Sequence, residues 1–257
     1  MPEELVAIKV ASGNWGGARI EDVKAVADSV VHSFRESLID STSIRIRLEP
    51  TATANDNPIA LSQLNANGDF VVHVNVKGNF WGQLGYQFAH EFCHVLADPS
   101  TWVQDRFAWV EEVFCEVASL FALRQMALNW ATDSPYRNWR DYADSLGQYA
   151  SDRMATLKPQ LSGSEELSAW LTSHYSDLEA NPYLREENMV IAVFLLPLIE
   201  SNPMAWRVIR RIHSFARLQD WNVCDFMNAW NNACLSEVDK AFLHEAESAF
   251  GCGKNTG

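Results

Sequence analysis

The sequence predicts an α+β fold in which a small N-terminal mixed sheet with one helix precedes a mainly helical C-terminal part. Two observations carry this prediction. Short apolar runs of strand length lie before residue 77, and apolar residues recur every three or four positions along most of the remaining chain. The 257 residues are 47% hydrophobic, which is enough to bury a sizeable core.

The first part of the chain alternates strands with one helix. Ile and Leu alternate with Arg at 44–48, which is typical of a half-buried strand. Gly68 and the neighbouring asparagines tolerate positive φ, so residues 65–69 are predicted to form a hairpin turn. The predicted strands are 5–10, 44–48, 59–64 and 70–76, with a helix at 20–38.

Apolar periodicity predicts helices in the rest of the chain. Residues 152–166 are polar and contain Pro159 and Gly163, so they are predicted to be a connection. We divide the chain into an α/β subdomain at 1–130 and a helical subdomain at 131–257. The predicted helices are 83–96, 106–130, 187–199, 205–215, 223–231 and 237–250.

Charge and composition narrow the range of partners. The net charge of −13 argues against nucleic acid and anionic membranes, because both require a basic face. No apolar run approaches the roughly 20 residues of a membrane span, and no signal peptide is visible. We therefore expect a cytoplasmic protein that does not bind membranes. Its five cysteines lack CxxC spacing and are expected to be reduced, buried thiols.

The segment His90-Glu91-Phe92-Cys93-His94 reads HExxH inside an apolar helical pattern. Residues four apart share one face of a helix, so His90 and His94 can hold one zinc ion. Glu91 lies beside that pair and can take a proton from the water that zinc activates. The composition gives roughly 0.013 chance matches to this pattern, which disfavours a fortuitous occurrence.

The next predicted helix offers a carboxylate as third ligand. Glu112 and Glu116 lie one turn apart on the same face of that helix. We expect Glu112 to bind zinc and Glu116 to accept an N–H from a ligand imidazole. Glu111 lies about 100° around the helix from Glu112 and is expected to face water.

HExxH followed by a glutamate on a second helix resembles the gluzincin metallopeptidases. The segment Trp109-Val110-Glu111-Glu112 is similar to the aromatic-apolar-Asn-Glu segment of alanyl-aminopeptidase-type enzymes, which also favours Glu112 as the ligand. The resemblance covers about residues 70–250. It implies a pair of zincin active-site helices that hold one zinc ion per chain.

The resemblance also implies a tyrosine that steadies the developing oxyanion. In this family it stands just before an apolar helix, and here Tyr183 precedes the apolar run at 189–199. Tyr183 is therefore the candidate, with an ordinary interfacial tyrosine as the alternative. His174 and His213 compete for the same role.

Two further implications concern how substrate binds. The Gly-x-Met-Glu-Asn segment that anchors the substrate amino terminus in aminopeptidases is missing from residues 60–85. Aminopeptidase specificity therefore cannot be carried over. The strand at 70–76 occupies a position that, in zincins, lies near an edge strand pairing with extended substrate. An internal strand is the alternative.

Together these features predict a zinc-dependent peptidase that hydrolyses peptide bonds of a peptide or protein substrate. His90, His94 and Glu112 are the predicted ligands, and Glu91 and Tyr183 are the predicted catalytic residues. A zinc-binding regulatory module without turnover is the alternative, although a pure metal site does not need Glu91. A helical interaction protein with a fortuitous HExxH is a third interpretation. The oligomeric state is left open.

Overall fold

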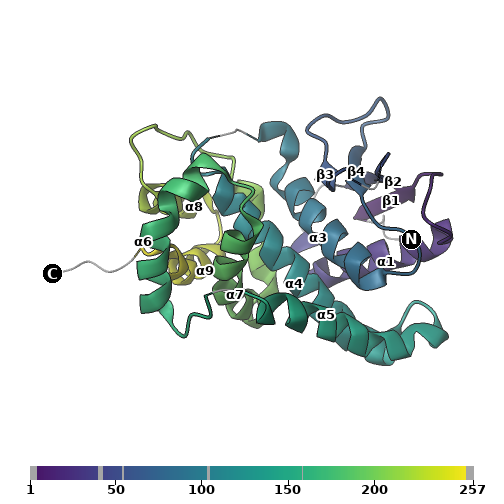
Figure 1. Ribbon diagram of the computed structural model, residues 1–257. Coiled ribbons are helices and arrows are strands. Elements are labelled where there is room, and N and C mark those ends of the chain that lie inside the picture. Colours follow the sequence, from purple (N-terminus) through teal and green to yellow (C-terminus); the bar gives the residue numbers. More distant parts are fainter. Residues whose placement is uncertain (1–4, 40–42, 54, 103–104, 158, 253–257) are drawn as a thin grey trace.

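Figure 1 shows the computed structural model of the chain, which describes residues 5–39, 43–53, 55–102, 105–157 and 159–252. The fold is α+β, as the sequence predicts. A four-stranded mixed sheet lies near the N-terminus, and helices make up most of the rest. The sheet lies at one side of the molecule and the C-terminal helices at the other (Figure 1).

The sheet has the spatial order β1-β2-β4-β3. The parallel strands are β1 (Val6–Val10), β2 (Ile44–Pro50) and β4 (Phe70–Val74), and β3 (Ile59–Ala60) pairs antiparallel with β4. The strand that precedes the HExxH helix is therefore internal, and β3 forms the edge beside it. The predicted hairpin turn between these strands is confirmed, because Gly68 has φ +76° and Asn65 accepts two backbone N–H groups.

The two faces of the sheet differ as the alternation in the sequence predicts. Ile46 and Leu48 of β2 are buried in the core, whereas Arg45 on the other face pairs with Asp69. Helix α1 (Ile20–Ser33) buries an apolar stripe between β1 and the helices. The helix expected over 20–38 is interrupted at Phe34, and its last turn is the separate α2 (Arg35–Leu38).

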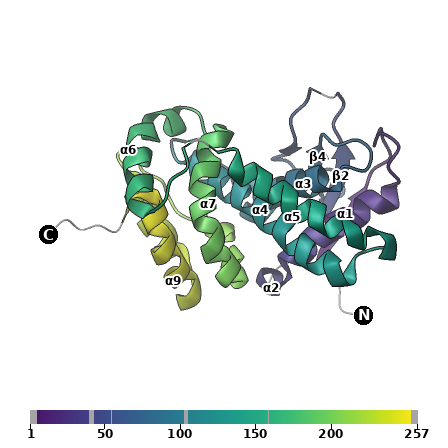
Figure 2. The ribbon, with the colours of Figure 1, turned by 60° about the horizontal axis from the view of Figure 1, so that its bottom comes forward.

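Two long helices at the centre of the molecule connect its two parts. They are α3 (Trp81–Ala97) and α4 (Ala108–Asp133), which pack side by side. Every side chain of α4 from Ala108 to Leu123 is buried. The reason is enclosure, since α3, α5 (Ala143–Ala155) and α7 (Arg185–Ser201) all pack on α4 (Figure 2). One hydrophobic core accordingly runs through both parts of the chain.

The C-terminal part contains more helix than the sequence predicts. The segment 152–166, expected to be a connection, includes the end of α5 and the start of α6 (Ser164–Ala180). Residues 203–211 form a 3₁₀ helix, which corrects the α-helix expected at 205–215. The remaining elements are α8 (Val223–Ala233), α9 (Glu237–Ala246) and the 3₁₀ segments Pro99–Thr101, Arg137–Tyr142 and Glu247–Phe250.

The expectation of five reduced cysteines is wrong for one pair. Cys224 at the start of α8 and Cys252 form a disulfide, with their Cα atoms 5.4 Å apart. The other three, Cys93, Cys115 and Cys234, are free and buried. The pair has no CxxC spacing, so only the packing of the C-terminal helices brings the two sulfurs together. Within the described residues, no helix is both long enough and apolar enough to cross a membrane.

Candidate metal centre

The HExxH segment lies in the C-terminal half of α3, as predicted. Phe88 and Phe92 face the core and stack on each other, which fixes the helix face that carries the histidines. One turn earlier, the Gln87 side chain accepts the backbone N–H of Asn75, just beyond β4. The helix ends at Asp98, which adopts the left-handed conformation (φ +65°) that acidic residues tolerate better than most.

Helices α3 and α4 bring the three predicted ligands together. Nε2 of His90 lies 3.2 Å from Oε2 of Glu112, and Nε2 of His94 lies 3.5 Å from Oε1 of the same carboxylate. Neighbouring ligand atoms in a tetrahedral zinc site with bonds of 2.0–2.1 Å are about 3.3 Å apart. Each imidazole therefore approaches Glu112 at about this spacing, through a different oxygen of the carboxylate. Each side chain keeps 8–14% of its surface exposed, so solvent reaches the site.

Glu111 does not face water, which corrects the sequence-based expectation. It is 1% exposed, and Oε1 lies 2.7 Å from Nδ1 of His94. Its other oxygen, Oε2, lies 2.8 Å from Nε2 of His213. The expectation failed because this part of α4 is enclosed on all sides and has no solvent face. Glu111 therefore connects a predicted zinc ligand to a histidine more than a hundred residues away in the sequence.

Glu116 lies beside the other histidine. Its Oε1 is 3.7 Å from Nδ1 of His90, and it also accepts the Nε–H of Arg185 at 3.0 Å. Its Oε2 accepts the hydroxyl of Tyr86 from α3. Each imidazole thus has a buried carboxylate behind it, Glu111 for His94 and Glu116 for His90. Such carboxylates fix the tautomer and orientation of metal-binding histidines.

Burial and close contacts shift the pKa values of this cluster. Burial lowers the pKa of His94, but the hydrogen bond that its ring donates to Glu111 and the charges of the nearby carboxylates outweigh burial and raise it well above its usual range. Burial raises the pKa of Glu111, but His213 and His94 outweigh it and bring the value to about 2. The pKa of Glu112 is lowered by both histidines against the effect of burial. The shifts of Glu111 and Glu112 favour carboxylates that are ionised at neutral pH.

Glu91 has the environment expected of a base. It is buried, and burial raises the pKa of its carboxyl above the ordinary value, against the opposing charges of His90 and His94. The backbone N–H of Ala60 in edge strand β3 donates to this carboxylate. The next N–H, that of Leu61, turns the other way and donates to Val71 of β4. The outward side of the edge strand therefore borders Glu91.

The three candidates for oxyanion stabilisation occupy different environments. Tyr183 is 56% exposed, and burial of its phenol together with the charges of Glu112 and Glu111 raises its pKa. His213 is engaged with Glu111, as described above. His174 lies on α6, where its ring stacks on Trp170 and Nδ1 is 2.7 Å from the Trp170 carbonyl. Of the three, Tyr183 is the exposed side chain, and the charge of the predicted ligand Glu112 contributes to its raised pKa.

A cysteine adjoins the same histidines. His90, His94 and Cys115 form a buried cluster whose potential ligand atoms lie within 4.8 Å of one another, so this cluster could hold a metal ion. Sγ of Cys115 lies 3.6 Å from Nδ1 and 3.5 Å from Nε2 of His94, so it sits over the ring. A metal bound jointly by this sulfur and the lone pair of one nitrogen would leave the sulfur about 5 Å from the other nitrogen. Glu112, which approaches the Nε2 atoms of both histidines, is the other candidate for the third ligand.

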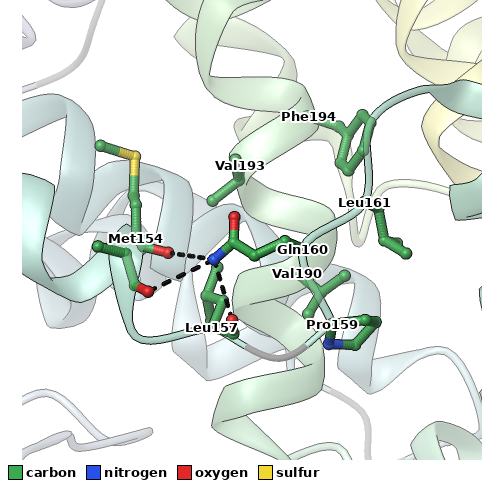
Figure 3. Close-up of a pocket in the computed structure, with 9 residues that line it drawn as sticks. Met154, Leu157, Pro159, Gln160, Leu161, Val190, Val193 and Phe194 are labelled. Atoms are coloured by element: carbon green, nitrogen blue, oxygen red, sulfur yellow. Dashed lines mark hydrogen bonds between the residues drawn. The ribbon is translucent and has the colours of Figure 1, made fainter.

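Two of the cavities among the described residues lie outside the ligand set. One, of about 230 Å³, lies between the end of α5 and α7 and is lined by Leu157, Leu161 and Phe194 among others (Figure 3). The other, of about 720 Å³, is bordered by Phe107, His213 and the segment 215–219. His213 thus has one side toward this second cavity and the other toward Glu111.

Sequence reasoning missed several members of the centre. Glu111 was assigned to the surface, and Tyr86, Arg185 and the Ala60 N–H were not considered. Periodicity could have found Tyr86, because it lies four residues before His90 on the same helix.

The chain matches no protein-family model, no curated protein and no solved structure.

Proposed function

We propose that this chain is a zinc-dependent peptidase of the gluzincin type. The observation that supports it most is that Nε2 of His90 and Nε2 of His94 lie 3.2 Å and 3.5 Å from the two oxygens of Glu112. Glu91 stands next to that trio on the same helix, which a purely structural metal site would not require. The family resemblance of HExxH and the following glutamate points the same way.

In this proposal two buried carboxylates, those of Glu111 and Glu116, lie behind the histidine ligands. Glu111 lies 2.7 Å from Nδ1 of His94 and orients that ring, which directs its Nε2 toward the metal, whereas Glu116 lies 3.7 Å from Nδ1 of His90 and supplies a nearby negative charge. Zinc, when bound, would polarise the scissile carbonyl and make a water molecule more acidic. The donor set of two imidazoles and a carboxylate suits zinc.

Glu91 accepts the proton of the attacking water and passes it to the leaving amine. Its raised pKa suits the first step, because burial makes the carboxylate a better proton acceptor than an exposed one. Tyr183 donates its phenolic O–H to the oxyanion that develops on the substrate. An exposed phenol beside the metal ligands can reach a bound peptide without displacing a core contact.

The outward side of β3 binds the substrate backbone in this proposal. An edge strand carries unpaired backbone groups that a peptide in extended conformation can use. The Ala60 N–H on this side of the strand is engaged with Glu91, which places the edge beside the proposed base. A peptide added at this edge would therefore lie next to the proposed base.

The experiment is a cleavage profile of a random peptide library with zinc-loaded protein, read by mass spectrometry. The Glu91→Gln variant is the matched control, since it retains the ligands but cannot accept the proton at neutral pH. We expect cleavage by the wild type and none by the variant. If both proteins bind one zinc and neither cleaves any peptide, the chain is a zinc-binding module instead.

A further inference from the structure

Arg185 brings a positive charge to the margin of the metal centre. It is the first residue of α7, two positions after Tyr183. Its Nε donates to Oε1 of Glu116 at 3.0 Å, and its side chain is 49% exposed while that of Glu116 is 1% exposed. A half-exposed arginine side chain is therefore paired with a fully buried carboxylate.

The same guanidinium is electrostatically coupled to Glu91. Its charge interacts with Glu116, with Tyr86 and with Glu91. Arg185 is thus paired with the carboxylate that lies 3.7 Å from Nδ1 of His90, one residue before the proposed base Glu91.

Neutralising Glu116 does not by itself account for an arginine at this place. The hydroxyl of Tyr86 already donates to Glu116, and Arg153 lies 5.2 Å over the Tyr86 ring and interacts with the same carboxylate. A guanidinium carries five N–H donors in a planar fork, and the bond from Nε uses one of them. The Nη fork can bind a carboxylate through two parallel hydrogen bonds.

We propose that Arg185 forms a subsite for a carboxylate of the substrate, next to the bond that is cleaved. Two sources supply this chemistry: the free C-terminal carboxylate of a peptide, or the side chain of an Asp or Glu residue. The inference rests on the proposed peptidase function. The carboxylates of the centre repel an acidic substrate. The positive charge of Arg185 offsets this repulsion and so allows an acidic substrate to bind.

The test compares three peptides that share the sequence around a cleaved bond. One ends in a free carboxylate next to that bond, the second ends in an amide, and the third ends in an amide but carries Glu there. We expect kcat/KM for at least one of the two carboxylate peptides to exceed that of the neutral peptide by about tenfold to a hundredfold, as for a charge-assisted hydrogen bond. Whichever is favoured identifies the source. Equal values for all three would overturn the proposal.

Variants then assign the preference to Arg185. Arg185→Gln should bring the carboxylate-to-amide ratio close to one, and Arg185→Lys should keep part of it because Lys retains the charge but not the fork. Weaker support of Glu116 would slow all peptides alike, so it does not change the ratio. Arg153→Gln is the matched control, since it removes the other cation near Glu116 and should leave the ratio unchanged. A ratio that survives in Arg185→Gln contradicts the proposal.

A binding measurement separates this inference from the peptidase proposal. Titration calorimetry of the same three peptides into zinc-loaded Glu91→Gln protein requires no turnover. Carboxylate-selective binding that is lost in Glu91→Gln/Arg185→Gln supports the subsite even if the wild type cleaves nothing. Absence of selectivity in both binding and cleavage overturns the subsite, whereas cleavage without selectivity overturns it and leaves the peptidase standing.

Discussion

Glu111 and Glu112 are neighbours in the sequence, yet they play different parts in the proposed centre. Glu112 presents its oxygens to Nε2 of both histidines, and Glu111 bridges Nδ1 of His94 to His213. The helix phase predicts different environments for the two, but its prediction that Glu111 faces water is wrong. The charge of Glu111 is therefore a poor guide to its exposure, because α4 is buried on all sides from Ala108 to Leu123.

Glu111→Gln should lower zinc affinity about 10–100-fold, the usual effect of removing a partner that orients a metal-binding histidine. Gln keeps the shape of the side chain but cannot accept from both histidines as a carboxylate does. Competition with a chromophoric chelator measures the affinity. Glu245→Gln on the exposed face of α9 is the control and should match the wild type. An unchanged affinity in Glu111→Gln would show that His94 is oriented without this carboxylate.

Tyr183→Phe should lower kcat by about 10²–10³-fold with little change in KM, as expected for the loss of one oxyanion donor. The substitution removes a hydroxyl and no ring volume, and the side chain is exposed, so stability should not change. Steady-state kinetics with a cleaved library peptide provide the measurement. If the variant is as fast as the wild type, Tyr183 does not touch the reacting atoms.

At the scale of elements, the edge strand and the two central helices define the site. The sequence predicted β3, β4, α3 and α4 because each depends on local periodicity. It left open whether the strand at 70–76 is an edge, since strand order depends on pairing between distant segments. The contacts of Glu111 with His213 and of Glu116 with Arg185 were unpredictable for the same reason, as α7 and the segment after it return to α4 from far along the chain.

Two proline substitutions separate the outward and inward sides of β3. Ala60→Pro removes the N–H that reaches Glu91, and a proline with that orientation is tolerated on an edge strand. It should reduce kcat/KM at least tenfold while the melting temperature stays close to that of the wild type. Leu61→Pro removes a ladder bond to Val71 and should instead lower the melting temperature. Full activity in folded Ala60→Pro protein would exclude the edge strand from substrate binding.

At the scale of the whole molecule, the α+β architecture follows from where strand and helix periodicities occur along the chain. The sequence does not predict helices α5 and α6, because polar residues dominate them. It does not predict the disulfide either, because the spacing of the two cysteines is not typical of a bonded pair. The disulfide fastens the segment after α9 to the start of α8. Phe250, two residues before Cys252, packs on Trp109 and Phe114, which flank the glutamates of α4.

Cys224→Ser should lower the free energy of unfolding by about 2–4 kcal/mol, because the unfolded chain regains the freedom of the closed loop. Denaturant titration under oxidising conditions measures this loss. Reducing agent should abolish the difference between wild type and variant, since both then lack the bond. Equal stabilities before reduction would mean that the disulfide contributes nothing to the folded state.

The central claim is that His90, His94 and Glu112 hold zinc. X-ray absorption at the zinc edge of loaded protein tests it most directly, since zinc bonds to nitrogen and oxygen are about 2.0–2.1 Å long and bonds to sulfur about 2.3 Å. We predict one zinc per chain with a nitrogen and oxygen shell alone, which Glu112→Ala weakens and Cys115→Ser leaves intact. A sulfur shell that disappears in Cys115→Ser, or protein that takes up no zinc, would contradict the account.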